Sequence, residues 1–167
     1  MKKGELEKAI LELPQNQKKM RQQLLDFFDT DLLFFFSDKP ELYLRQKQEW
    51  QPILDWIEEL WLIKPNVTQS LDVPDNTKLK DKLPMMFDKM NSKEFCCWYA
   101  ASLNLRSVLL GLALVLRKID AKQAANLAAI EEIWQNEQWG EDKEALATRQ
   151  ARDEELREIE SFLLCAM

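Results

Sequence analysis

The sequence contains no histidine and only three glycines among its 167 residues. Without histidine, the chain has no imidazole for a general base, for a nucleophile triad or for a mixed histidine–carboxylate metal site. The glycines lie far apart, at positions 4, 111 and 140, so they cannot build a glycine-rich phosphate loop. These absences exclude most of the common hydrolase and metalloenzyme chemistries.

Cysteine is also scarce, and its three positions do not resemble a disulfide framework. Cys96 and Cys97 are adjacent and would point in different directions on a helix, and Cys165 lies near the end of the sequence. We interpret all three as small buried apolar residues in a reducing compartment.

Long apolar runs are missing as well. The most apolar stretch, VLLGLALVL at 108–116, has nine residues, whereas a membrane-spanning helix needs roughly 20. We predict a buried core helix there and no membrane insertion. The opening MKKGELEKAI turns acidic at residue 5 and predicts neither a secretory signal nor a transit peptide. A bacterial cytoplasmic location is therefore expected, with the mitochondrial matrix as the alternative.

Acidic residues outnumber basic ones by 29 to 23, which gives a net charge of −6. Such a chain repels phosphate backbones and anionic membrane surfaces, so we do not expect it to bind nucleic acid. Hydrophobic residues make up 46% of the sequence, which is enough for a core and argues against disorder.

What the sequence does have is helical periodicity almost throughout. Leu, Ala, Glu, Lys, Gln and Arg dominate, and apolar–polar alternation of period two is rare. The pattern predicts an all-α fold, an orthogonal bundle of about six to seven helices in one domain spanning 1–167. The expected helices are 4–12, 17–36, a helix that starts near Pro40, 78–90, 93–118, 121–138 and about 142–165.

Several residues mark where these helices begin and end. Ser37 or Asp38 is expected to cap the helix that has Pro40 in its first turn, and Pro52 should kink or split that helix. Residues 64–78 form the clearest loop. Asp120 and the glutamine three residues later predict a capping box. One of Asp29, Thr30 and Asp31 is expected to cap a turn.

The stretch WQNEQWGED at 134–142 places two tryptophans among polar residues. At about 100° per residue, positions 134 and 139 lie roughly 140° apart around a helix, so we do not expect them to share one narrow face. Trp134 continues the apolar positions of Leu127 and Ile130 and should be core. Trp139 has two alternatives. It packs under the start of the last helix with its indole N–H on a helix-end carbonyl, or it is an exposed protein-binding anchor.

Three blocks together resemble the assembly chaperones of the F1 part of ATP synthase that handle its α subunit, the mitochondrial and alphaproteobacterial type. They are DTDLLFFFSDKPEL running on to QEWQPILDW, then SVLLGLALV, then LAAIEEIWQNEQWGED. The residues that match are Thr30, Asp31, Phe35, Pro40, Gln46, Gln48, Trp50, Pro52 and Trp56 in the first block, and Leu127, Glu131, Glu132, Trp134, Gln135, Trp139 and Gly140 in the third. Departures from the family pattern lie at Phe36, Gln51, Ala128 and Ala129.

The resemblance implies a holder protein that is not an enzyme. Such a chaperone binds the unassembled F1 α subunit, prevents its aggregation and hands it to the β subunit, and it uses no ATP, metal or other cofactor. The family has an N-terminal β-rich domain and a C-terminal helical domain. The matched blocks belong to the helical one, so this chain is expected to lack the β-rich domain. We expect it to be monomeric when free.

The partner-binding surface is expected at the end of the third block. Its candidate residues are Glu131, Glu132, Gln135, Trp139, Glu141 and Asp142. Two other interpretations stay open. One is a helical interaction module, or a remnant, with a different partner. The other is a carboxylate Mg²⁺ site built from Glu131, Glu132 and Asp142.

Overall fold

The computed structural model describes residues 1–165, and this part of the chain consists of helices and loops without a named β-strand. The predicted all-α class is confirmed. The helices are α1 (Lys3–Leu11), α2 (Leu13–Phe28), the 3-10 helix η1 (Leu32–Phe34), α3 (Pro40–Trp61), α4 (Thr77–Lys80), α5 (Leu83–Lys89), α6 (Ser92–Leu105), α7 (Val108–Val115), α8 (Ala121–Ala128), α9 (Ile130–Trp139) and α10 (Lys143–Leu164).

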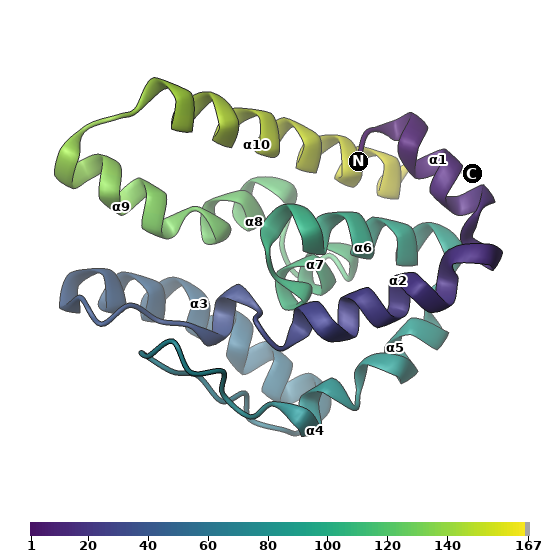
Figure 1. Ribbon diagram of the computed structural model, residues 1–167, viewed down its shortest axis with the longest axis horizontal. Coiled ribbons are helices and arrows are strands. Elements are labelled where there is room, and N and C mark those ends of the chain that lie inside the picture. Colours follow the sequence, from purple (N-terminus) through teal and green to yellow (C-terminus); the bar gives the residue numbers. More distant parts are fainter. Residues whose placement is uncertain (166–167) are drawn as a thin grey trace.

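Helices α6 and α7 lie at the centre of the molecule (Figure 1). Every residue of α7 is buried, because it carries no polar face to turn toward water. Helix α10 runs along one side of α6, α2 packs on α6 from another side, and α3 and α9 lie together at one end. Cys96 and Cys97 are buried in this core, as predicted, whereas Cys165 lies just after α10 and is exposed, so the prediction that it is buried is wrong.

Four predicted helices are each broken in two. The helix expected at 17–36 ends at Phe28 and is followed by η1, and the helix expected at 78–90 is divided into α4 and α5. The helix expected at 93–118 ends at Leu105, since Arg106 adopts the left-handed conformation with φ 58° and Ser107 caps the start of α7. The helix expected at 121–138 is interrupted at Ala129, between α8 and α9. The apolar pattern resumes at Val108 after the first of these two breaks and continues from Leu127 to Ile130 across the second, so the periodicity does not reveal them. The helix count is therefore higher than predicted.

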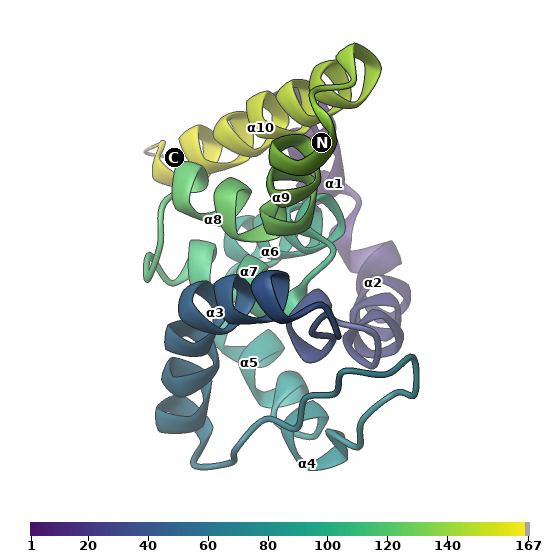
Figure 2. The ribbon, with the colours of Figure 1, turned by 90° about the vertical axis from the view of Figure 1, so that its left-hand side faces the viewer.

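The predicted helix signals are mostly confirmed. Asp120 forms the expected capping box with Gln123, and α9 ends at Gly140, whose φ is 86°. Pro40 opens α3, but the cap position is Lys39, and Ser37 accepts a hydrogen bond from the Lys39 backbone N–H. Helix α3 continues through Pro52 and bends along its length (Figure 2).

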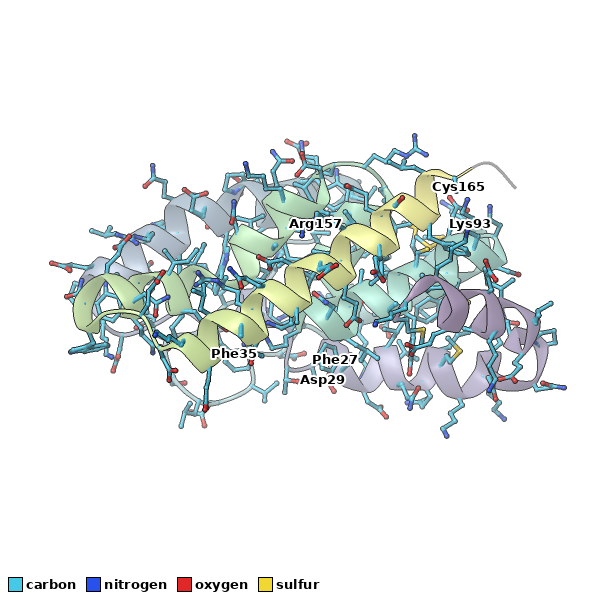
Figure 3. All side chains as sticks on the ribbon, turned by 90° about the horizontal axis from the view of Figure 1, so that it is seen from above. Phe27, Asp29, Phe35, Lys93, Arg157 and Cys165 are labelled. Carbon is cyan, nitrogen blue, oxygen red and sulfur yellow. The ribbon has the colours of Figure 1, made fainter. Side chains whose placement is uncertain are left out.

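The ends of the described chain are tied to the body of the molecule. The amino group of Met1 pairs with Glu155 on α10. Near the end of α10, the Lys93 ammonium group donates to the Cys165 carbonyl, and Figure 3 labels these two residues side by side. Between α3 and α4, the predicted loop is held by reciprocal hydrogen bonds between Asn66 and Asn76.

Helices α6 and α7 approach each other closely at Gly111. A Cβ atom at this position would lie 2.5 Å from the Ser102 hydroxyl oxygen and 3.1 Å from Trp98, so only glycine fits. The Ser102 hydroxyl is buried and has no hydrogen-bond partner among residues 1–165. An unsatisfied buried hydroxyl costs free energy, because it loses its bonds to water on folding.

We therefore expect Ser102→Ala to leave the free energy of unfolding unchanged or to raise it by about 1 kcal/mol. Urea denaturation followed by circular dichroism measures the change. Gly111→Ala is the matched comparison, because the added methyl group overpacks the same contact and should cost about 1–3 kcal/mol. A marked loss of stability in Ser102→Ala would show that its hydroxyl has a partner after all.

Candidate functional site

The two tryptophans of α9 lie together, although their spacing predicts that they diverge. Trp134 is buried, with 7% of its surface exposed, and its prediction as a core residue is confirmed. The ring of Trp139 meets it edge to face, with 5.8 Å between the centroids. The angle around the helix gives the directions in which the two side chains leave the backbone. Tryptophan side chains are long enough for their rings to meet despite that angle.

Trp139 is the exposed member of this pair. It has 71% of its surface open to solvent, so it is not packed under α10, and that alternative is wrong. The other alternative, an exposed anchor, agrees with this placement. An aromatic ring that is rigid at its base and open to solvent is the type of residue that dominates protein–protein contacts.

Lys39 completes the tryptophan pair from a distant part of the sequence. Its ammonium nitrogen lies 5.3 Å from the centroid of Trp134 and 5.7 Å from that of Trp139. Both distances are within the range of a cation–π interaction. The sequence offers no signal for this contact, because Lys39 precedes α3 and the tryptophans belong to α9.

An ion pair joins the same two helices. Arg45 of α3 donates to Glu137 of α9, with 2.8 Å between nitrogen and oxygen. This hydrogen bond lowers the pKa of the Glu137 carboxyl group and raises the pKa of Arg45. Both groups face solvent, so the pair fixes the orientation of α9 more than it adds stability.

The six predicted contact residues fall into two groups. Glu131, Gln135, Trp139 and Glu141 are exposed. Glu132 instead accepts two hydrogen bonds from Arg152, at 2.7 and 2.8 Å, and so connects α9 to α10. Asp142 caps α10 by accepting from the backbone N–H of Glu144 at 2.9 Å. These last two carboxylates have structural partners.

A groove of about 360 Å³ adjoins this face, between η1, α3 and the start of α9. Trp50 and Gln46 lie at its buried side, and the Trp50 indole donates to the Leu127 carbonyl at 2.8 Å. The Arg106 guanidinium donates to the Ala128 carbonyl at 2.9 Å. The lining residues are Leu32, Phe35, Gln46, Trp50, Arg106, Ala128, Glu131, Glu132 and Gln135.

Three predicted contact residues therefore share a wall of this groove, namely Glu131, Glu132 and Gln135. The groove itself was not predicted. Phe35, labelled in Figure 3, and Arg106 reach it from segments that no local spacing connects with α9. The Mg²⁺ interpretation is wrong for residues 1–165, since no three acidic or cysteine side chains there are placed to hold a metal ion.

Comparison with known proteins identifies the fold. Residues 4–58 match the family described as ATP12 chaperone protein. The crystal structure of Atp12 from Paracoccus denitrificans superposes with a TM-score of 0.86 and 27% sequence identity, covering 93% of this chain and 68% of that one. The first third of the chain thus matches the ATP12 chaperone family, and the fold is similar to that of Atp12 over most of the chain.

Two further solved structures show a similar likeness in fold. A point mutant of the Paracoccus denitrificans Atp12p superposes with a TM-score of 0.87 at 28% identity, over 93% of this chain and 68% of that one. A putative chaperone from Agrobacterium tumefaciens gives 0.85 at 25% identity, over 93% of this chain and 59% of that one. The chain thus spans about three fifths to two thirds of the length of these solved proteins.

The ATP12 resemblance was predicted from three sequence blocks, and it is confirmed. The family match at 4–58 contains the first block, and the likeness in fold extends over most of the chain. Within residues 1–165, no helix has both the length and the apolar character that a membrane crossing requires.

Proposed function

We propose that this protein is a non-enzymatic assembly chaperone for the α subunit of F1 ATP synthase. It binds the unassembled subunit, keeps it from aggregating and hands it to the β subunit. The observation that carries this proposal is the likeness in fold to Atp12 over 93% of the chain. We assign residues 1–167 to the helical C-terminal domain of the family and the bundle to its orthogonal type.

The proposed client surface is the exposed face of α9 and its last turn. Trp139 is the apolar anchor, and the polar residues proposed beside it are Glu131, Gln135 and Glu141, which are all exposed. Glu132 and Asp142 support this face by orienting α9 and α10. The net charge of −6 favours a client surface that is basic.

The chemistry of this face suits holding rather than catalysis. Its polar groups accept hydrogen bonds in an exposed setting, and its groove is open to solvent. We propose that the protein acts as a monomer in the bacterial cytoplasm, because the solved structures that it resembles come from bacteria. Location in a mitochondrial matrix is the alternative.

One observation favours a second candidate, a helical interaction module with a different partner. Phe36 stands where the resembled family has an arginine, and it is buried against Trp50 with 5.3 Å between the ring centroids. A polar group of the family pattern is thus replaced by core packing. If this position contributes to client choice, the partner differs.

A co-refolding experiment tests the proposal. Purified F1 α subunit is diluted from denaturant with and without this protein, and light scattering and size exclusion follow. We expect suppressed scattering and a complex that elutes as one species, whereas F1 β subunit treated in the same way should gain no protection. Unchanged aggregation of the α subunit, with this chain still helical, would refute the proposal and favour the second candidate.

A further inference from the structure

Lys39 contacts two aromatic rings, whereas the other cations over rings in residues 1–165 contact one each. Its ammonium group lies over both rings, at 5.3 and 5.7 Å. No carboxylate among residues 1–165 comes within 4.0 Å of it. The Lys39 ammonium group therefore interacts with the aromatic faces and not with a carboxylate, although several acidic residues are close in sequence.

The tryptophan pair is built to hold a cation whether or not Lys39 supplies it. Trp134 is buried, which restricts its rotation, and Trp139 meets it edge to face at 88°. Glu137 between them is anchored by Arg45 across the helices. Lys39 itself is exposed on a flexible stem, so it can leave without disturbing the core.

The surroundings would favour a second, stronger cation. Glu131 precedes the pair on α9, and Glu141 and Asp142 follow it. An arginine suits such a site better than lysine, because its planar guanidinium stacks on an aromatic ring and still donates to carboxylates. A cation arriving from a bound protein would meet the π faces, and the negative charge of the carboxylates nearby in the sequence would favour its approach.

We propose that the Trp134–Trp139 pair is the binding site for an arginine side chain on the surface of the client, and that Lys39 is an internal placeholder for it. On binding, the guanidinium takes the position over the rings and Lys39 swings into solvent. This inference rests on the proposed function, since it names the chemical group that the chaperone recognises on the F1 α subunit.

The test measures the dissociation constant of the refolded complex for matched variants of the full chain. Trp139→Ala should raise it about tenfold or more, as expected for a central aromatic contact, and Trp139→Phe should recover most of the loss. Lys39→Met removes the placeholder charge and keeps its stem. It should lower the dissociation constant by about two- to fivefold, because the client cation no longer competes. Leu71→Ala changes an exposed leucine on the loop between α3 and α4 and is the control without effect.

Nuclear magnetic resonance provides a measurement that would not change on client binding if Lys39 had only a structural role. In the free protein, ring currents should shift the Lys39 ε-methylene protons upfield, and binding of the client should return them to ordinary values. A Lys39→Met variant that weakens binding as much as Trp139→Ala would overturn the placeholder role. If wild type and Trp139→Ala bind the client equally well, the arginine site is refuted and the proposed chaperone function is not. If the wild-type protein forms no complex with the client, both the arginine site and the proposed chaperone function are refuted.

Discussion

Asp31→Ala should lower the free energy of unfolding by about 3–5 kcal/mol, because three hydrogen-bond donors lose their acceptor in the core. Asp31 is completely buried. One carboxylate oxygen accepts from the Leu33 backbone N–H at 3.0 Å and from the Ser107 hydroxyl at 2.7 Å. The other accepts from the Leu109 backbone N–H at 3.0 Å.

These bonds join elements that are far apart in the sequence. Asp31 caps η1 and simultaneously holds the start of α7, where Ser107 is the helix cap. The break between α6 and α7 therefore depends on a side chain from the segment after α2. Without it, the left-handed Arg106 and the first turn of α7 lose their tie to the rest of the core.

Urea denaturation at fixed pH, followed by circular dichroism, measures this effect. Asp29→Ala is the control. This neighbouring aspartate lies at the surface, where it accepts from Lys80 at 3.0 Å, and its loss should cost at most about 1 kcal/mol. If both variants unfold at the same urea concentration, Asp31 does not organise the junction.

The same residue predicts a pH dependence. Burial raises the pKa of Asp31 from 3.8 to about 6, and the hydrogen bonds oppose this shift without cancelling it. The folded state thus holds this proton more tightly than the unfolded chain does. The stabilisation from Asp31 is complete below pH 3.8 and is lost as the pH rises through about 6, by about 3 kcal/mol in total.

Asp31→Asn isolates this contribution, since asparagine has nearly the same shape and does not titrate. The stability of the wild type relative to Asp31→Asn should fall between pH 4 and pH 7, and denaturant titrations at several pH values measure the difference. A relative stability that rises over this range would mean that the three donors outweigh burial and keep the carboxylate ionised.

The sequence predicts local features such as a helix cap, but it does not predict hydrogen bonds between residues that are far apart in the chain. A cap at Asp29, Thr30 or Asp31 follows from residue type, but the bonds from Asp31 to Ser107 and Leu109 span more than seventy residues. The all-α class can be predicted from the periodicity of apolar residues. The left-handed turn at Arg106 cannot, because it does not change that spacing.

The candidate site shows the same division. Trp134 could be assigned to the core because it repeats the apolar spacing of Leu127 and Ile130 in the sequence, although Leu127 belongs to α8 and the other two residues to α9. The cation over its ring comes from Lys39, and the groove beside it needs Phe35 and Arg106. These contacts arise only when α3, η1 and α9 pack together, so no spacing within one segment encodes them.

Trp134→Ala should destabilise the fold by about 3–5 kcal/mol, the usual range for a large aromatic removed from a core. Its ring is buried at the base of α9 and contacts both Lys39 and Trp139, so truncation leaves a cavity that these exposed neighbours cannot fill. Circular dichroism during urea denaturation is the suitable measurement, because tryptophan fluorescence changes with the substitution itself.

Trp139→Ala is the matched control, since it removes the same side chain from the same helix at a position that is 71% exposed. We expect it to cost about 1 kcal/mol, mainly the edge-to-face contact with Trp134. The two variants therefore separate a core role from a surface role within one helix. If Trp139→Ala unfolds as readily as Trp134→Ala and shows no separate loss of client binding, Trp139 is a structural residue and the anchor interpretation is wrong.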